Sequence, residues 1–80
     1  MKISDKELKK IISKALNVKI SLVNDNTNSD KMEEWDSLGQ LSIISSLDKK
    51  LSGKIDLSKA NNLNSYKNIK NFLKKKSIMK

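Results

Sequence analysis

The 80-residue chain contains no cysteine, histidine, proline or arginine. The lack of cysteine excludes disulfide bonds, thiolate zinc ligands and cysteine nucleophiles. The lack of histidine removes the commonest general base and metal-binding side chain, so imidazole-based catalysis and catalytic triads are also excluded. We therefore expect a protein that is not itself an enzyme, with no catalytic residue and no metal site of its own.

Long apolar segments are also missing from the sequence. No run approaches the roughly 18 consecutive apolar residues that a membrane-spanning helix requires. Residues 1–10 are charged and lack the apolar central region of a secretory signal peptide. A chain of 80 residues is long enough for one small hydrophobic core, which predicts a single domain over residues 1–80. We expect this domain to be cytoplasmic and monomeric, without stable insertion into a membrane.

Acidic residues are scarce: nine of them accompany 17 lysines, which gives a net charge of +8. Residues 25–36 hold five acids and one lysine, a local charge of −4. The rest of the chain holds 16 lysines and four acids, a charge of +12. The sequence therefore places one acidic segment within a basic background.

The excess of lysine raises the alternative of a small basic helical protein that binds nucleic acid. Arginine, which makes the best bidentate contacts to bases and phosphates, is absent, and three aromatic residues are too few for a stacking platform. A second alternative is contact of the lysine-rich C-terminal region, beside Phe72 and Leu73, with an anionic membrane. We favour a face of solvated lysines and expect no nucleic-acid partner.

Residues 4–16 carry a clear helical pattern. Ser4 and Glu7 have the spacing of a capping box, in which each side chain bonds a free N–H group near the helix start. Asn17 follows as a candidate left-handed stop. The apolar positions recur at intervals typical of one helical face and comprise Leu8, Ile11, Ile12, Ala15 and Leu16.

A loop over residues 17–36 separates this helix from a second one, which is predicted over residues 37–51. The loop is rich in Asn, Asp, Ser and Thr, and we expect Trp35, its one large aromatic residue, to pin it to the core. Gly53 is the predicted stop signal after the second helix. The apolar positions of this helix comprise Leu38, Leu41, Ile43, Ile44, Leu47 and Leu51.

The remainder of the chain predicts a short turn or helix over residues 57–61 and a last helix over residues 65–75, with Ser65 as its N-cap. Residues 74–80 are mostly polar, and we expect a frayed tail. The sequence contains no alternating strand pattern and no hairpin turn signal. The predicted fold class is therefore all-α, a small bundle of three or four helices.

A polar step, Asp36-Ser37, leads into the second helix. The first N–H groups of a helix have no acceptor within the helix, and the helix dipole places positive partial charge there. A phosphate on the Ser37 hydroxyl would be stabilised at such a place. The same serine is equally suited to cap the helix, with Gln40 completing a capping box. On these residues alone, capping is the simpler interpretation.

Residues 34–44, with the sequence EWDSLGQLSII, resemble the attachment motif of acyl carrier proteins, whose second helix opens with Asp-Ser-Leu. The tripeptide is a weak signal by itself. The likeness nevertheless extends over nearly the whole chain, because an amphipathic helix, a long loop, the motif, a second helix and a closing helix follow in the family's order. The resemblance implies a bundle of the acyl-carrier-protein type.

The resemblance also implies that Ser37 carries 4′-phosphopantetheine, which a phosphopantetheinyl transferase would donate from coenzyme A. Its thiol would present acyl groups as thioesters to acyl- or adenylate-forming ligases, acyltransferases or condensing enzymes. Asp36 would cap the helix or hold the metal-bound coenzyme A of the transferase, and Leu38 would dock partner enzymes unless it belongs to the core. The other docking residues that the resemblance implies are Ser42, Asp48, Glu33 and Glu34.

The chain departs from typical fatty-acid carriers, which are strongly acidic along the second helix. Here that face offers serines and lysines, and because complementary charge guides partner choice we expect a dedicated or accessory biosynthetic pathway. Trp35 before the motif and residues 39–41 after it are similar to carriers of adenylating ligases and modular systems, which load short, hydroxylated or aminoacyl groups. For Ile43, Ile44 and Leu47, a cleft for an acyl chain and an ordinary core are both open, and the core is favoured.

Overall fold

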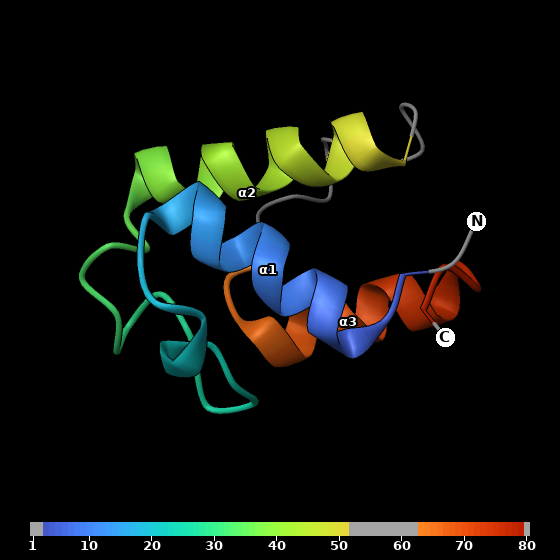
Figure 1. The fold of residues 1–80 in the computed structure, drawn as a ribbon, viewed down its shortest axis with the longest axis horizontal. Coiled ribbons are helices and arrows are strands. Elements are labelled where there is room, and N and C mark those ends of the chain that lie inside the picture. Colours follow the sequence, from blue (N-terminus) through green and yellow to red (C-terminus); the bar gives the residue numbers. More distant parts are fainter. Residues whose placement is uncertain (1–2, 52–62, 80) are drawn as a thin grey trace.

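The computed structural model describes residues 3–51 and 63–79. In these two ranges the chain forms three α-helices, α1 (Asp5–Leu16), α2 (Ser37–Lys50) and α3 (Tyr66–Lys75), and a short 3₁₀ turn, η1 (Ile20–Leu22), but no strand (Figure 1). The small, mostly helical architecture confirms the all-α class. None of these helices is long and apolar enough to span a bilayer. The predicted stop at Gly53 and the predicted turn over residues 57–61 lie outside the described residues.

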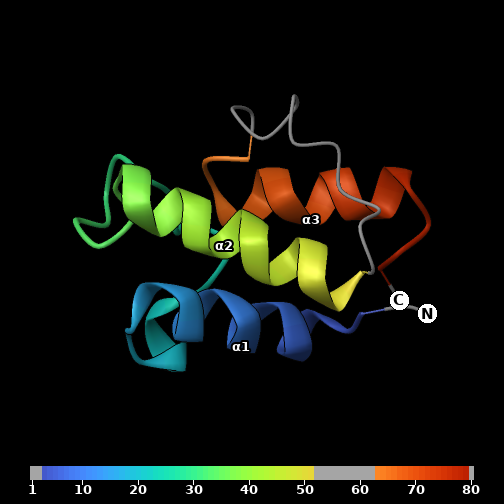
Figure 2. The ribbon, with the colours of Figure 1, turned by 90° about the horizontal axis from the view of Figure 1, so that it is seen from above.

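The three helices surround one core, with α2 above α1 and α3 in Figure 1 and between them in the view from above (Figure 2). The start of α1 and the end of α3 lie at one end of the molecule, where the Ile3 N–H donates to the carbonyl of Ile78 at 2.7 Å. The start of α2 lies at the other end, next to the loop between α1 and α2 (Figures 1 and 2). The first turn of α2 is therefore set apart from the chain ends.

Local capping signals fix both ends of α1 and the start of α3 as predicted. The Ser4 hydroxyl accepts a hydrogen bond from the Glu7 N–H at 3.2 Å, and Asn17 ends α1 in the left-handed region, at a φ of 57°. At the start of α3, the Ser65 hydroxyl accepts from the Asn68 N–H at 3.0 Å. Each signal acts within about one helical turn, which is why the sequence pattern alone located these ends.

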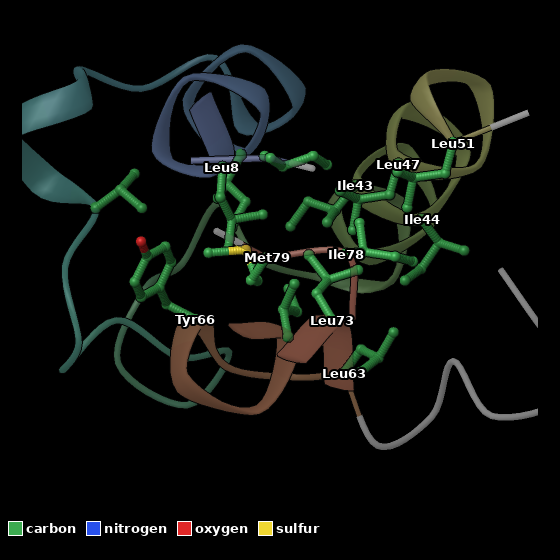
Figure 3. Packing of buried hydrophobic residues seen from close by; sticks show 14 of the residues in the cluster. Leu8, Ile43, Ile44, Leu47, Leu51, Leu63, Tyr66, Leu73, Ile78 and Met79 are labelled. Atoms are coloured by element: carbon green, nitrogen blue, oxygen red, sulfur yellow. The ribbon is translucent and has the colours of Figure 1, made fainter. Parts of the chain in front are cut away.

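The core lies between the three helices, and each helix contributes fully buried side chains (Figure 3). Leu8 of α1, Leu47 of α2 and Leu73 of α3 have no exposed surface. Trp35 and Tyr66 are the largest of the fully buried side chains. Burial of a side chain of leucine size stabilises a fold by roughly 1.5–3 kcal/mol, so these residues dominate the stability of so small a chain.

The tail is not frayed at residues 77–79, contrary to the prediction. Ser77 adopts a left-handed conformation, with a φ of 59°, and the Ile78 N–H donates to the Leu73 carbonyl at 2.9 Å. This turn brings Ile78 and Met79 back onto the core, where each is 6% exposed (Figure 3). The prediction was wrong because the tail packs beside the opposite end of the chain, a pairing that local composition does not reveal.

The start of α2 is oriented differently from the prediction. Leu38 is 75% exposed and Leu41 is 63% exposed, so assigning them to the apolar face that packs on the core was wrong. Gly39, Ile43 and Leu47 are buried instead, and their spacing of four residues places them on one face. The helix therefore turns a glycine inward and two leucines outward.

Candidate functional site

Asp36, rather than Ser37, caps α2. Its backbone is extended, and its Oδ1 accepts a hydrogen bond from the Gly39 N–H at 2.8 Å. Its carbonyl accepts from the Gln40 N–H, also at 2.8 Å. Of the two interpretations of Ser37, capping completed by Gln40 is therefore excluded, because Asp36 occupies the cap position and Ser37 is the first helical residue. The capping role expected for Asp36 is present.

Ser37 is left with an exposed side chain. Its hydroxyl forms no hydrogen bond with any residue that the structure describes, and the N–H groups of Ser37 and Leu38 have no acceptor among those residues. These two N–H groups lie at the positive end of the helix dipole. The start of α2 thus combines a free hydroxyl, two free donors and a positive potential, which suits an anionic substituent on the hydroxyl.

A close approach of backbone segments fixes this first turn. A Cβ atom on Gly39 would lie 2.5 Å from the carbonyl oxygen of Glu34 and 2.7 Å from Cδ2 of Leu16. Both separations are too short for a side-chain carbon, so residue 39 has room for glycine alone. The start of α2 is pressed against the end of the loop and the last turn of α1, and this contact holds Ser37 in position.

Trp35 pins the end of the loop, as predicted. Its side chain is 2% exposed, and its indole N–H donates to Oε1 of Gln40 at 2.6 Å. Its backbone N–H donates to the carbonyl of Met32 at 3.0 Å. Because Gln40 lies one turn after Ser37, these bonds tie the residue that precedes the Asp-Ser-Leu motif to the helix that follows it.

The loop over residues 17–36 is ordered around a buried threonine. Thr27 is 6% exposed. Its hydroxyl donates to the carbonyl of Leu22 and accepts from the N–H of Asn24, each at 2.9 Å. A loop of this length is therefore folded by its own side chain to backbone bonds, as compact functional loops often are.

Two backbone hydrogen bonds join this loop to the segment that leads into α3. The Ser29 N–H donates to the Asn64 carbonyl at 2.9 Å, and the Tyr66 N–H donates to the Thr27 carbonyl at 2.9 Å. We refer to these four residues as the clip. The clip brings two asparagine- and serine-rich segments together, although they are far apart in the sequence.

A groove with a volume of about 460 Å³ opens beside Ser37, between the start of α2 and the clip. It is lined by Ser29, Trp35, Asp36, Ser37, Gln40 and Asn64. Sequence reasoning missed Ser29 and Asn64. Their only signal was the clustering of Asn and Ser in both segments, which is typical of turns and does not say which segments meet.

The predicted docking residues are distributed along α2 and the loop before it. Leu38 and Ser42 are exposed and share one face of the helix. Asp48 is half-buried near the end of the helix, while Glu33 and Glu34 are exposed just before the motif. Four of these five residues therefore lie near Ser37, and Asp48 lies further along.

The three residues considered for an acyl cleft are packed in the core. Ile43, Ile44 and Leu47 are 0%, 2% and 0% exposed. They belong to the same buried cluster as Leu8 and Leu73 (Figure 3). The structure supports the core interpretation of these residues.

An electrostatic cluster joins α1 to α3, outside the groove. The Tyr66 hydroxyl donates to the Asp5 carboxylate, and the Lys70 and Lys9 ammonium groups lie 3.1 Å and 3.5 Å from its oxygens. The hydrogen bond from Tyr66, followed by the hydrogen bond and charge of Lys70, holds the pKa of Asp5 below its ordinary value although partial burial opposes this. Burial and the bond to Asp5 raise the pKa of Tyr66 above its ordinary value.

Within the described residues, no three acidic side chains gather into a group that could hold a metal ion. In comparisons with protein-family models, curated proteins and solved structures, no match was found for this chain. The interpretation of the site therefore rests on its geometry and on the sequence motif that it contains.

Proposed function

We propose that the protein is a carrier of the acyl-carrier-protein type, which bears 4′-phosphopantetheine on Ser37 and is not itself an enzyme. The observation that carries this proposal is the free, exposed Ser37 hydroxyl at the start of α2, where Asp36 performs the capping that would otherwise occupy it. The Asp-Ser-Leu motif and the order of the helices support the same function. The chain is then a single carrier domain that acts as a cytoplasmic monomer.

The surroundings of Ser37 suit a phosphodiester. The N–H groups of Ser37 and Leu38 have no acceptor among the described residues and can donate to a phosphate oxygen. A helix start stabilises a nearby negative charge by about 0.3–1 kcal/mol. The adjoining groove, of about 460 Å³, offers room for an arm that begins at Ser37. When bound, 4′-phosphopantetheine supplies a thiol on which acyl groups are held as thioesters.

The chain contributes one nucleophilic oxygen to its own modification. Oγ of Ser37 attacks the phosphorus of coenzyme A that bears the pantetheine, an O–P bond forms to the serine, and the P–O bond to 3′,5′-ADP breaks. The hydroxyl proton passes to a base of the phosphopantetheinyl transferase. Asp36 positions the serine by capping the helix, with its Oδ1 bound to the Gly39 N–H.

The outer face of α2 supplies the docking surface in this proposal. Leu38, Leu41, Ser42 and Ser45 are exposed there, and Lys49 follows near the end of the helix. An apolar and hydroxyl-bearing face of this kind fits an uncharged partner surface better than the basic surface that an acidic carrier requires. The partners are then the ligase, acyltransferase or condensing enzymes of a dedicated or accessory pathway.

The proposal is tested by intact mass after incubation with coenzyme A and a broad-specificity phosphopantetheinyl transferase. We expect the wild type and a Ser21→Ala variant to gain one phosphopantetheine each, since Ser21 is an exposed serine that belongs neither to the groove nor to the docking face. We expect a Ser37→Ala variant to gain none. A wild-type protein that gains no mass with several transferases would contradict the proposal.

A further inference from the structure

Two rows of lysines run along α1 and α3. In each row the later lysines follow the first by three, four or seven residues, a spacing that places them on one side of the helix. The two rows comprise Lys6, Lys9 and Lys10 of α1 and Lys67, Lys70 and Lys74 of α3. We refer to these six residues as the basic face.

The Asp5 carboxylate joins the two rows into one surface. Its oxygens lie 3.5 Å from Nζ of Lys9 and 3.1 Å from Nζ of Lys70. The same two ammonium groups lie 6.0 Å and 5.9 Å from the centre of the Tyr66 ring. Lysines of α1 and α3 therefore meet where the helices touch, and the exposed members of both rows extend the surface on either side. The sequence alone favoured solvated lysines because it does not show that the rows meet.

Positive charge on the basic face exceeds the negative charge beside it. Asp5 brings one negative charge, which two lysines share. Asp25, an exposed loop residue, is close enough to act electrostatically on Tyr66. The six lysines outnumber these two acids by four charges. Charges within the Debye length, about 8 Å at physiological salt, act together on a charged partner.

The basic face lies on the side of the molecule that is turned away from α2. Both α1 and α3 lie below α2 in Figure 1, and α2 lies between them in the view from above (Figure 2). Glu7, on the other side of α1 from Lys9, reaches Lys50 at the end of α2, at 3.7 Å. The lysine rows meet across the contact of α1 with α3 instead. A partner on the basic face would therefore leave the outer face of α2 accessible.

The composition of the basic face favours a lipid surface over a protein or a nucleic acid. The centre of a protein interface is poor in lysine, and the exposed large apolar residues of the described chain belong to η1 and α2 instead. Nucleic-acid binding favours arginine and stacked aromatic rings, but the chain has no arginine and Tyr66 is buried. Clusters of about four to eight basic residues attract anionic lipids.

We infer that the basic face holds the protein on the surface of an anionic bilayer, through electrostatic contact of its lysines with lipid headgroups. The contact is peripheral and inserts no segment into the hydrocarbon layer. The inference goes beyond the proposed function and does not depend on it, because the lysines of α1 and α3 act without Ser37. In the bound state α2 points away from the lipid.

The first test is cosedimentation of the full-length, unmodified protein with vesicles. One set of vesicles contains phosphatidylcholine alone, and the other contains phosphatidylcholine and phosphatidylglycerol in equal amounts. We expect binding to the second set only, and we expect added salt to weaken it because salt screens the charges. Absence of binding to the anionic vesicles at low salt would overturn the inference.

The second test compares two double variants of equal net charge. Lys6→Gln with Lys67→Gln removes one exposed lysine from each row, and Lys31→Gln with Lys49→Gln removes two exposed lysines from the loop and from α2. We expect the first variant to lose roughly fivefold in vesicle partitioning for each lysine removed. The second should stay within about twofold of the wild type, because its lysines lie beyond the Debye length from the lipid.

Two results of these measurements would contradict the assigned face and partner. Equal losses in the two double variants, both with wild-type circular dichroism, would mean that net charge alone attracts the protein. Displacement of the wild type from anionic vesicles by duplex DNA at a lower phosphate concentration than that of the lipid would assign the face to nucleic acid. Because the unmodified protein is used, the proposed function stands or falls separately, by the mass of Ser37.

Discussion

The helices α1 and α3 turn their apolar faces onto the core, whereas α2 leaves Leu38 and Leu41 in solvent and turns Gly39 inward. For α1 and α3, serine caps and periodic apolar positions decide both the ends and the orientation. For α2, an aspartate cap and a close backbone approach decide them. The difference shows that the first turn of α2 presents its side chains to solvent, and these include the free Ser37 hydroxyl.

The largest expected effect comes from comparing a buried with an exposed leucine of α2. Leu47 is 0% exposed and Leu41 is 63% exposed. A Leu47→Ala variant leaves a cavity and should lower the free energy of unfolding by about 2–5 kcal/mol, whereas Leu41→Ala should change it by no more than about 0.5 kcal/mol. Urea denaturation measures both values. Equal losses would mean that α2 does not have the described orientation.

A Gly39→Ala variant tests the close approach that orients α2. The added Cβ would meet the Glu34 carbonyl oxygen at 2.5 Å. Overpacking of this kind should lower the free energy of unfolding by about 1–3 kcal/mol. Ser42→Ala is the matched control, because Ser42 is an exposed position of the same helix and alanine favours helix. Wild-type stability of the Gly39→Ala variant in the same denaturation experiment would contradict the described contact.

Substitutions at Asp36 and Ser37 distinguish the stabilising effect of the helix cap from that of the Ser37 hydroxyl. Asp36→Ala removes the acceptor for the Gly39 N–H and should cost about 1 kcal/mol of stability, while Asp36→Asn should retain most of it. Ser37→Ala should stay within about 0.5 kcal/mol of the wild type, since the Ser37 side chain is exposed and bonds no described residue. Thermal and urea denaturation rank the stabilities of the three variants. A larger loss for Ser37→Ala than for Asp36→Ala would make Ser37 the cap.

The smallest expected effect concerns the pH dependence of the α1–α3 contact. The pKa of Asp5 lies below its ordinary value of 3.8, chiefly because of the bond from Tyr66. The folded state thus favours the ionised carboxylate, a stabilisation that is present above the ordinary pKa and is lost as pH falls through the lowered one. In a Tyr66→Phe variant we expect the pKa of Asp5 to rise, as measured by ¹³C NMR titration of its carboxyl group. An unchanged titration would show that Tyr66 does not control it.

At alkaline pH, Tyr66 makes the stability of the fold fall as the pH rises, the opposite of the effect of Asp5. Its pKa is raised above the ordinary value of 10.0, so the folded state retains the phenolic proton more strongly than the unfolded chain. The stabilisation of the fold by this retained proton is fully present below pH 10 and is lost as the pH rises above it. The melting temperature of the wild type should therefore decline in that range more than that of Tyr66→Phe.

The parts of the fold that the sequence predicted are those decided within one helical turn. The caps at Ser4 and Ser65 and the stop at Asn17 depend on neighbouring residues alone. Trp35 was also predictable, because a single large aromatic residue in a polar loop has few other roles than to fill the core. Its partner Gln40 was not foreseen, since the hydrogen bond depends on how the loop enters α2.

The parts that the sequence did not predict depend on contacts between distant segments. Gly39 faces inward because Glu34 and Leu16 meet it there, and apolar periodicity by itself favoured Leu38 and Leu41 instead. Ser29 and Asn64 share a groove only because the clip joins their segments. Ser37 was located by its motif, but the distinction between a cap and a free hydroxyl required the geometry of Asp36.

The central claim is that the Ser37 hydroxyl is presented for covalent modification, and its most direct test is the mass of the protein recovered from the cells that make it. We expect the peptide that contains Ser37 to carry one phosphopantetheine, and the remaining serine peptides to be unmodified. Recovery of the protein with Ser37 entirely unmodified, from cells that modify other carriers, would contradict the account and leave the exposed hydroxyl without a function.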